Sequence, residues 1–309
     1  MLDAPPPLLD HLSETYQSGE ALARRLGVSR VAVWKQAQAL REAGYPIEVA
    51  RGRGYRLAPG TPTPARLAPR LKGRFGRPYR YLGRVASTQD ALRKWAEAGA
   101  PEGALVLAEQ QTQGRGRRGR GWASPAGAGL YFSLLLRPAL PLTALPRLTL
   151  AAGVALAEAA GVGGLKWPND LLAPDGNKLA GVLLEADLLG EEVRYVLLGI
   201  GLNVHQSPLP EGAAYLEAYR PARRVEVLAH LLERLEHWYA RLGEPEAILA
   251  AWRARSYTLG RPVRVRWVGG VVEGVAVDLE ADGALVVEVA SGKRTRISAG
   301  DVELVGGIR

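Results

Sequence analysis

The sequence predicts an α+β fold in three segments, and each segment has its own pattern of hydrophobic residues. Residues 8–57 show helical periodicity followed by a hairpin, residues 66–258 alternate apolar strands with helices, and residues 261–309 contain short strands separated by glycine turns. With 309 residues, 47% of them hydrophobic, the chain is long enough for two or three domains and for a core that needs no disulfide. We therefore expect three domains, at residues 1–60, 61–258 and 259–309.

The composition excludes several classes of protein. The chain has no cysteine, so thiol catalysis, disulfides and cysteine-bound zinc are excluded, and its four histidines have no metal-ligand spacing. The N-terminus lacks a signal-peptide pattern and no apolar run is long enough to span a bilayer, so we expect a cytoplasmic protein with no membrane partner. The net charge of +9 suits nucleic acid or a phosphate-bearing ligand, although a general bias toward arginine would explain the same total.

The first segment has the signature of a helix-turn-helix. Helices are predicted at 8–16, 19–26 and 29–43, with Ser18 and Ser29 as N-caps. A small residue, a turn glycine and a buried aliphatic side chain stand where this motif needs them, at Ala23, Gly27 and Val33.

A basic hairpin follows, which predicts a winged helix-turn-helix. Strands at 47–50 and 55–57 flank its glycine-containing tip. Residues 19–57 carry eight basic and three acidic side chains, an excess of five within the total of +9. This charge favours DNA binding, and a protein-interaction module with a solvated basic face is the alternative. The expected DNA contacts are Ser29, Arg30, Trp34 and Lys35 on the recognition helix and Arg51 and Arg53 on the wing.

The middle of the chain predicts a mixed sheet. Residues 58–65 (APGTPTPA) suggest a proline-rich linker, and residues 66–84, with seven basic side chains and no acidic one, suggest a solvated face. Strands are predicted at 104–109, 130–136, 179–186 and 195–202, and helices at 88–98, 145–160 and 221–242. We expect the helices on one side of this sheet. In the last segment, alternation at 263–267 and turns such as Asp282-Gly283 predict a small β-barrel of SH3-like size.

The most distinctive motif is the stretch 110–122 (QQTQGRGRRGRGW). Glycine lets backbone N–H groups approach an anion closely, and arginine supplies forked donors for a carboxylate or a phosphate. Trp122 adds a flat apolar surface. Taken alone, the stretch also suits a flexible RNA-binding tract. It is not a Walker loop, because the GxxxxGK[ST] pattern is absent.

Two further motifs suit ligand binding. Residues 166–170 (KWPND) and Lys178, which opens KLAG, supply lysines and a carboxylate for phosphate and a divalent metal. An exposed turn with a surface ion pair is the alternative. Residues 199–204 (GIGLNV) put glycines inside a strand, which marks either close approach of a ligand or tight packing.

Together these motifs resemble the biotin protein ligase family. The chain carries Ser87-Thr88-Gln89, then Gln111 before GRGRRGRGW, then KWPND, KLAG and GIGLN, between a winged helix-turn-helix and a small barrel. The resemblance covers almost the whole chain, and KWPND with GRGRRGR is highly specific. It implies a class II synthetase-like ligase domain and the double function of ligase and biotin-operon repressor.

The family implies that ATP adenylates biotin and that the biotinyl group passes to a lysine of a biotin carboxyl carrier protein, the carrier subunit of acetyl-CoA carboxylase. The implied biotin-binding residues are Ser87, Thr88, Gln89, Gln111, Arg115, Gly116, Arg117, Trp122, Lys178, Gly181 and Gly201. The implied nucleotide-binding residues are Arg117, Lys166, Asn169, Lys178, Asn203 and Tyr215. The implied catalytic residues are Lys178, Arg115, Arg117 and Asp170, with Mg²⁺ linked to Asp170.

The family also implies regulation, in which an adenylate-bound homodimer binds palindromic operator DNA. Two positions depart from the family pattern. Gln89 stands where better-known members have asparagine, and residues 205–215 lack the tryptophan that covers adenine in some repressor-type members, so Tyr215 is the candidate replacement. Two other functions stay open, a non-enzymatic ligand-sensing regulator and a lipoate-type ligase.

Overall fold

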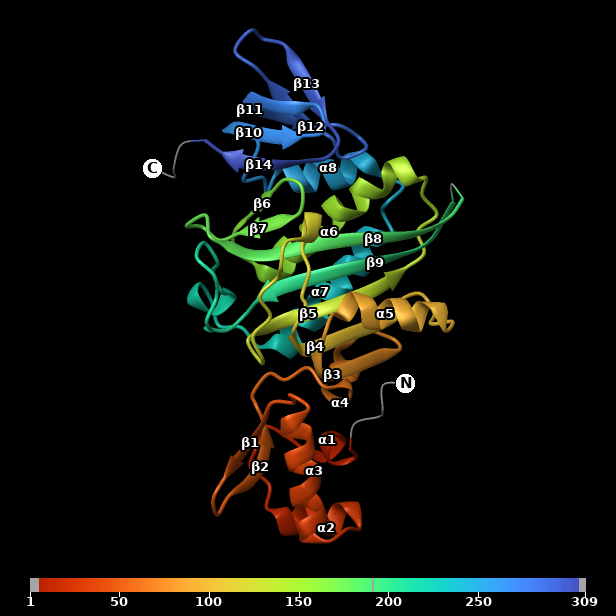
Figure 1. The fold of residues 1–309 in the computed structure, drawn as a ribbon, viewed down its shortest axis with the longest axis vertical. Helices are drawn as coiled ribbons and strands as arrows, with labels where there is room; N and C mark the ends of the chain where they lie inside the picture. Colours follow the sequence, from red (N-terminus) through yellow and green to blue (C-terminus); the bar gives the residue numbers. More distant parts are fainter. Residues whose placement is uncertain (1–5, 191, 306–309) are drawn as a thin grey trace.

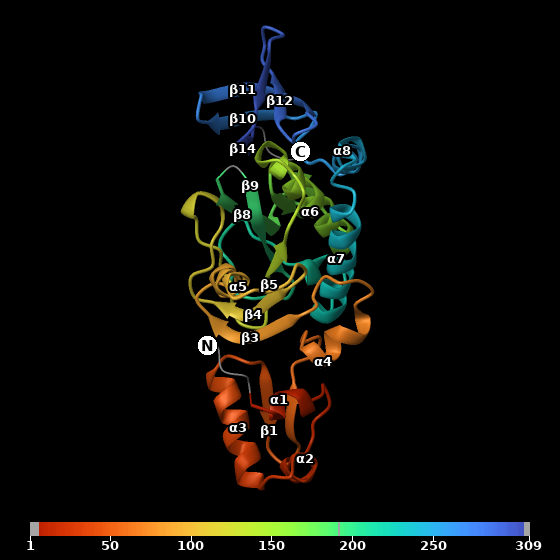
Figure 2. The same ribbon diagram turned by 90° about the vertical axis from the view of Figure 1, so that its right-hand side faces the viewer.

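The computed structural model describes residues 6–190 and 192–305, which form an elongated molecule of three stacked modules (Figure 1). The N-terminal module lies at one end, a seven-stranded sheet in the middle, and a five-stranded C-terminal sheet at the other end (Figure 2). The predicted α+β class is confirmed. The outermost residues of the first and last predicted domains, 1–5 and 306–309, lie outside the described residues.

The N-terminal module is a winged helix-turn-helix, as predicted. Its elements are α1 (Leu8–His11), α2 (Gly19–Leu26), α3 (Arg30–Glu42), β1 (Ile47–Ala50) and β2 (Gly54–Leu57). The Ser18 and Ser29 hydroxyls accept hydrogen bonds from the amides of Ala21 and Ala32, and Gly27 adopts φ +65° in the turn between α2 and α3. These caps and this turn are the features that the sequence indicated.

The first predicted helix is too long. It ends at His11 rather than Tyr16, because the chain then becomes extended and joins the wing. Gln17 and Tyr55 exchange two backbone hydrogen bonds of 2.9 Å across this join. The pairing satisfies backbone groups that a longer helix would otherwise have used.

The central sheet has the strand order β3-β4-β5-β9-β8-β7-β6. Its strands are β3 (Tyr79–Val85), β4 (Leu105–Gln111), β5 (Gly129–Leu136), β6 (Gly164–Lys166), β7 (Asp170–Leu172), β8 (Lys178–Leu189) and β9 (Glu192–Asn203). Only β3 and β4 run parallel, and every other neighbouring pair is antiparallel. The four predicted strands correspond to β4, β5, β8 and β9.

Helices cover both faces of this sheet, which corrects the expectation of helices on one side (Figure 2). The helices are α5 (Thr88–Glu97), α6 (Leu145–Ala160), α7 (Arg224–Tyr239) and α8 (Pro245–Arg253). On β5, Leu135 packs with Leu92 of α5, whereas its neighbour Leu134 joins the cluster formed with α6 and α7. All eight residues of β5 are buried, and because successive side chains point to opposite faces, both faces need apolar cover.

One segment of the described residues, Leu142–Ala160, is long and apolar enough to cross a membrane. It contains α6, and 67% of its most apolar window is buried inside the protein. The helix α6 packs against α7, α8 and the sheet. Its apolar character is therefore that of a core helix.

The C-terminal module is an antiparallel sheet with the strand order β13-β12-β11-β10-β14. Its strands are β10 (Pro262–Trp267), β11 (Gly270–Leu279), β12 (Leu285–Glu288), β13 (Arg294–Ile297) and β14 (Gly300–Leu304). Its size and all-β character agree with the predicted SH3-like module. Among residues 258–305, no hydrogen-bonded ladder joins β13 to β14, so the barrel is open at this seam.

Of the two predictions about residues 58–84, the linker is wrong. The expected linker is packed, since residues 60–63 are buried and a short helix, α4 (Pro64–Leu67), follows them. The remaining short helices are η1 (Ala68–Arg70), η2 (Arg117–Gly119), η3 (Leu142–Ala144) and η4 (Leu216–Ala218). The basic run is largely the solvated face that was predicted, since each of its basic residues except the partly buried Arg66 is exposed. Some of these side chains also pair with acids elsewhere in the chain. These pairs are Arg66 with Glu14, Lys72 with Glu233, and Arg74 with Glu102.

The winged module contacts the edge strand β3 directly. The Arg84 amide donates to the Ala43 carbonyl over 2.8 Å, and the Tyr45 hydroxyl donates to the Tyr81 carbonyl over 3.2 Å. A Cβ atom at Gly83 would collide with the Ala43 carbonyl, so this close approach requires glycine. The winged module is thereby bonded to the sheet as well as connected to it along the chain.

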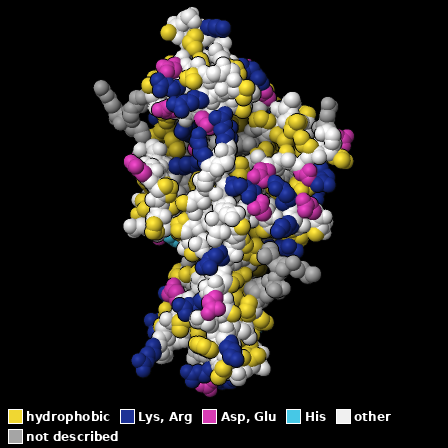
Figure 3. All heavy atoms as spheres, in the orientation of Figure 1, with side chains coloured by type: hydrophobic (Ala, Val, Ile, Leu, Met, Phe, Trp, Pro, Cys, Tyr) yellow, Lys and Arg dark blue, Asp and Glu magenta, His cyan; other side chains and the backbone are white. Residues whose placement is uncertain are grey.

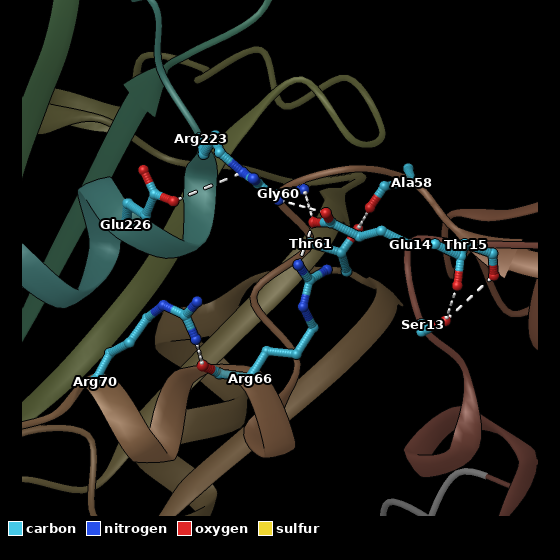
Figure 4. A network of polar contacts seen from close by, with 10 residues as sticks. All are labelled: Ser13, Glu14, Thr15, Ala58, Gly60, Thr61, Arg66, Arg70, Arg223 and Glu226. Atoms are coloured by element: carbon cyan, nitrogen blue, oxygen red, sulfur yellow. Dashed lines mark hydrogen bonds and ion pairs between the residues drawn. The ribbon is translucent and has the colours of Figure 1, made fainter.

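Glu14 is the centre of the polar contacts between the first two modules (Figure 4). Its carboxylate accepts hydrogen bonds from the Gly60 amide, at 2.6 Å, and from the guanidinium groups of Arg66 and Arg223. Burial alone would raise the pKa of Glu14, but the hydrogen bonds outweigh it and lower the pKa to about 2. The folded arrangement therefore favours the ionised carboxylate.

Replacing Glu14 with glutamine should loosen the docking of the winged module, because the charge-assisted bonds to Arg66 and Arg223 are lost. We expect hydrogen exchange at the Gly60 amide to speed up about 5-fold, measured on the intact chain. Glu20→Gln, an exposed change on α2, is the control and should leave Gly60 unaffected. Equal exchange rates in Glu14→Gln and the wild type would contradict this assignment.

The same contact predicts a pH dependence. The pKa of Glu14 is about 2 in the folded protein and about 4.3 in an unfolded chain, so its stabilisation is fully present above that higher value. It should be lost only as the pH falls from about 4 toward 2. Gly60 exchange, corrected for the intrinsic pH effect, should accelerate in that range in the wild type and not in Glu14→Gln.

Candidate active site and DNA-binding surface

A cavity of about 170 Å³ lies where β8 and β9 meet the glycine-rich loop, residues 112–122. It brings together every residue predicted to be catalytic or to bind biotin, and also Lys166 and Asn169 from the predicted nucleotide site. These residues come from the start of α5 and the residue before it, β4, the loop, β6, β7 and the turn between them, and strands β8 and β9. Elements far apart in the sequence thus contribute to one site.

The floor of the cavity is formed by Gly181 and Gly201, which face each other across β8 and β9. The Trp122 indole lies against both, since a Cβ atom on Gly201 would collide with it and one on Gly181 would come within 3.3 Å. The Lys178 ammonium lies 5.3 Å from the centre of the same indole. The two glycines therefore allow an aromatic ring to lie close to the strands. The sequence alone did not identify this ring as the reason for the glycines.

One wall of the cavity is polar and buried. Ser87, Thr88 and Gln89, at the junction of β3 and α5, are each at most 4% exposed. The Gln111 amide oxygen accepts hydrogen bonds from the Thr88 amide at 2.9 Å and the Thr88 hydroxyl at 3.0 Å. The Gln89 Oε1 atom is buried with no hydrogen-bond partner among the described residues. Because an unpaired buried acceptor is costly, it marks a position for a ligand donor.

Three of the loop's four arginines are held by carboxylates. Arg115 makes a two-pronged pair with Asp90 of α5, at 2.7 and 2.8 Å, and this hydrogen bonding raises the pKa of Arg115. Arg118 and Arg120 both donate to Asp301 of β14, at 2.7 and 2.8 Å. These arginines fix the loop at its base and at its tip.

Arg117 differs from the other three. Its guanidinium donates to the Asn169 Oδ1 atom at 3.2 Å and to the Gly300 carbonyl at 3.3 Å. Within residues 6–190 and 192–305, no carboxylate lies at ion-pair distance from it, and burial lowers the pKa of Arg117. Of the loop's cations, Arg117 is the one placed to meet an anionic ligand group.

Two lysines and a carboxylate form another part of the cavity. The Lys178 ammonium lies 2.7 Å from the Asp170 carboxylate, so the lysine and aspartate that the sequence singled out form an ion pair. Lys166 lines the same cavity, and burial lowers its pKa. Positive charge is thus concentrated in partly dehydrated surroundings, where it acts more strongly than in water.

A second cavity, of about 160 Å³, adjoins the first and shares Gly121, Trp122 and Lys178 with it. Asn203 lines this second cavity. Its amide nitrogen donates to the Ala214 carbonyl at 3.0 Å, and its Oδ1 atom is buried without a partner in the described part of the chain. Tyr215 lines neither cavity, so the structure does not bring this predicted nucleotide contact to the site.

The predicted DNA contacts are all exposed on the winged module. This module is the lower end of the molecule in Figure 3, where lysine and arginine side chains lie on the surface. They are Ser29, Arg30, Trp34 and Lys35 on or next to the N-terminal half of α3, and Arg51 and Arg53 at the wing. Trp34 is 55% exposed, which is unusual for so large an apolar side chain and suits a binding surface. The Arg53 guanidinium lies 4.3 Å from the centre of the Tyr16 ring, which restrains this wing residue.

Sequence reasoning missed the two acids that hold the loop. Asp90 follows Ser87-Thr88-Gln89 in the first turn of α5, but nothing in one sequence pairs it with Arg115. Asp301 lies 183 positions beyond Arg118, and no motif surrounds it. The only signal in the sequence was that Asp90 stands directly after a motif. Asp301 had no such signal.

The arrangement can bind two anionic groups side by side. Arg117, Lys166 and Lys178 line a cavity with an apolar floor, and hydrogen-bonding groups lie on its buried wall. Cations fixed in advance offset the repulsion between two anions and stabilise charge that builds up between them. The site therefore suits the joining of a carboxylate to a phosphate.

Family comparisons match all three modules. Residues 81–203 match the biotin/lipoate A/B protein ligase family, residues 8–56 an HTH domain, and residues 258–305 the biotin protein ligase C-terminal domain. The chain is 36% identical over 317 residues to the bifunctional ligase/repressor BirA of Bacillus subtilis (strain 168), with 96% of each chain covered. It is 32% identical to BirA of Escherichia coli (strain K12), with 88% of each covered.

A solved structure matches about three quarters of the chain. The biotin protein ligase from Aquifex aeolicus, in complex with biotin and ATP, matches with a TM-score of 0.61 and 32% identity, over 73% of this chain and 97% of that one. The three family models thus match the winged module, the central sheet and the C-terminal sheet of this one chain. The chain belongs to the biotin protein ligase family, in the bifunctional form that joins a ligase to a DNA-binding repressor.

Proposed function

We propose that the chain activates biotin with ATP to biotinyl-5′-adenylate and then transfers the biotinyl group to a lysine of a biotin carboxyl carrier protein in the cytoplasm. The observation that carries this proposal is the convergence of Arg117, Lys166 and Lys178 on one cavity. The biotin carboxylate and the α-phosphate repel each other, and cations fixed around both lower the barrier to their reaction. The carrier lysine then attacks the mixed anhydride and releases AMP.

Biotin is assigned to the first cavity. The buried side chains of Ser87, Thr88 and Gln89 and the half-buried side chain of Gln111 offer hydroxyls and amides to the ureido ring, and the Trp122 indole offers an apolar surface to the ligand. Arg117 is assigned to the valerate carboxylate, because its half-buried guanidinium has no carboxylate partner among the described residues. Arg115 is assigned to holding the loop, since Asp90 engages it.

ATP is assigned to the region between the two cavities. Lys178 lines both, so it suits the point where the carboxylate meets the α-phosphate. Lys166 and Asn169 line the first cavity, and the unpartnered Asn203 oxygen lines the second. Tyr215 receives no role in this assignment.

Magnesium would be held by ATP phosphates together with Asp170. The described residues contain no cluster of three metal-ligating side chains, so a cage made by the protein alone does not exist there. Mg²⁺ commonly takes one or two carboxylates together with substrate phosphates, and the single Asp170 carboxylate fits that donor set. When bound, the ion supplies further neutralisation of phosphate charge. The protein's own part is to orient Asp170 through Lys178, 2.7 Å away.

The winged module is proposed to bind operator DNA as a homodimer that forms when adenylate is bound. The exposed basic helix and wing support the DNA contact. A two-fold dimer would present two recognition helices to the two halves of a palindrome. The carrier protein would compete for the surface that the dimer uses.

Ligase activity can be tested directly. Incubation with biotin, MgATP and a carrier domain should raise the mass of the carrier by one biotinyl group and release pyrophosphate. Lipoate in place of biotin should give neither product. Attachment of lipoate in preference to biotin would contradict the proposed substrate, and pyrophosphate-free binding of biotin would indicate a sensor rather than an enzyme.

Asp170→Asn should slow adenylate formation by about 100-fold, because the carboxylate that orients Lys178 and would hold Mg²⁺ is lost. Pyrophosphate release measures this step. Asp187→Asn, which alters an ion pair with Arg194 in the outer part of β8, should not change it. With preformed adenylate, transfer at the wild-type rate in Asp170→Asn would exclude Asp170 as the acceptor of the lysine proton.

Arg51→Gln and Arg53→Gln should each weaken DNA binding and lower the salt slope of the binding constant by about one. Gel-shift titrations at several salt concentrations, on DNA from upstream of the biotin-synthesis genes, measure both quantities. Arg264→Gln, in the C-terminal sheet, is the control. Biotin with ATP should raise the affinity, and binding that does not depend on them would refute the repressor mechanism.

A further inference from the structure

Lys166, one of the cations at the first cavity, stands between two buried neighbours. Leu165 and Trp167 are each 2% exposed and belong to the main apolar core, whereas Lys166 lines the cavity. Successive side chains of a strand point to opposite faces, so β6 directs Leu165 into the core and Lys166 away from it. The position of the lysine therefore depends on how its two neighbours are held.

The connection between α8 and β10, residues 254–261, holds the first neighbour by its backbone. The Leu165 amide donates to the Arg255 carbonyl, and the Leu165 carbonyl accepts from the Tyr257 amide, each over 2.7 Å. The connection is itself fixed, since the Arg255 guanidinium donates to the Glu158 carboxylate of α6 over 3.1 Å. This part of β6 is therefore paired with a segment that α6 holds in place.

The second neighbour, Trp167, is held by two hydrogen bonds to buried partners. Its amide donates to the Thr258 hydroxyl, and its indole N–H donates to the Gly283 carbonyl in the turn between β11 and β12, each over 2.9 Å. Thr258 is fully buried. If its hydroxyl were removed, the Trp167 amide would lose its acceptor in a buried place, which costs free energy. The Thr258 hydroxyl thus fixes the backbone directly after Lys166.

The turn beyond Trp167 has a separate attachment. The Asn169 Nδ2 atom donates to the Val182 carbonyl at 2.8 Å, and the Val182 amide donates to the Asn169 carbonyl at 2.9 Å. These bonds tie Asn169 to β8 without the connection between α8 and β10. The contact of Arg117 with Asn169, on the biotin side of the site, should therefore not depend on Thr258.

We propose that Thr258 is a positioning residue for ATP: through the Trp167 amide it sets the place of Lys166, so that the lysine meets the nucleotide phosphates. This inference rests on the proposed role of Lys166 toward ATP. A small displacement of the lysine matters, because attraction between charges in partly dehydrated surroundings is strong and falls with distance. Thr258 therefore acts on the nucleotide side of the site and leaves the biotin side unchanged.

Thr258→Val tests the proposal on the full chain, since valine has nearly the same shape but cannot accept a hydrogen bond. Without ligand, hydrogen exchange of the Trp167 amide should speed up about 10-fold. In the pyrophosphate assay, kcat/KM for MgATP should fall by about 10-fold. The Kd for biotin, measured by calorimetry without ATP, should stay within about 2-fold of the wild type.

Two variants serve as controls. Thr258→Ser keeps the hydroxyl and should bring both the exchange rate and kcat/KM close to the wild type. Arg147 of α6 donates to the Ala281 carbonyl at 3.1 Å, two residues before Gly283 in the same turn. Arg147→Gln should loosen the C-terminal module at that turn and leave kcat/KM for MgATP unchanged, which separates the contact with Trp167 from general loosening of the module.

Lys166→Gln shows whether the effect passes through the lysine. Alone, it should lower kcat/KM for MgATP, and adding Thr258→Val should lower it little further, because the group that Thr258 positions is already gone. Full additivity of the two changes would overturn the proposal. If Thr258→Val fails to fold, Trp167→Phe removes the bond to the Gly283 carbonyl and should give the same selective loss for MgATP.

The remaining outcomes are distinct. Wild-type exchange of the Trp167 amide in Thr258→Val would overturn the contact, and faster exchange with unchanged kcat/KM for MgATP would overturn the positioning role. A biotin Kd that rises as much as kcat/KM falls would also overturn it, since the effect would then not be confined to the nucleotide. If the wild type released no pyrophosphate, the proposed function would fail, while exchange of the Trp167 amide would still report on Thr258.

Discussion

The positively charged side chains at the cavity repel one another, and the surrounding structure holds them in place. Three acids from three different elements do this: Asp90 in α5 holds Arg115, Asp170 in β7 holds Lys178, and Asp301 in β14 holds Arg118 and Arg120. Arg117 and Lys166 lack such a partner among the described residues, and burial lowers the pKa of both. The site is thus prepared for anions, since a bound anion relieves the cost of holding these two cations away from water.

The sheet supports this arrangement from below. Apolar layers on both faces hold β5 and β9 in place, and the paired glycines of β8 and β9 leave a flat area that the Trp122 ring and the Lys178 side chain cover. A methyl group at Gly201 would displace Trp122, and with it one surface of the first cavity. The packing of the apolar floor therefore also determines the shape of the cavity that the charged side chains line.

Local patterns in the sequence predicted much of this structure. Caps at Ser18 and Ser29 and the turn at Gly27 located α2 and α3, because these signals act over a few residues. The residues chosen for biotin and catalysis all line one cavity, because the motifs that carry them are specific. Asn203 and Tyr215 were assigned by the same route, yet the first lies in the adjoining cavity and the second in neither.

What could not be predicted depends on contacts between distant residues. The first helix stops early because Gln17 pairs with Tyr55, and the proline-rich segment is buried because Glu14, Arg66 and Arg223 meet around it. An apolar strand such as β5 is compatible with helices on one face or on two, and only the packing decides. The partnership of Asp301 with the loop joins positions 183 residues apart, and no local pattern marks it.

The bond between Arg84 and Ala43 has a mechanical consequence. It joins the C-terminal end of α3 to strand β3. Three residues after Arg84, the chain reaches Ser87 in the polar wall of the cavity. The recognition helix and the polar wall of the first cavity are therefore connected through the end of one edge strand, with Gly83 at the point of contact. Any change in the tilt of that helix relative to the sheet would therefore act on the strand that leads to Ser87.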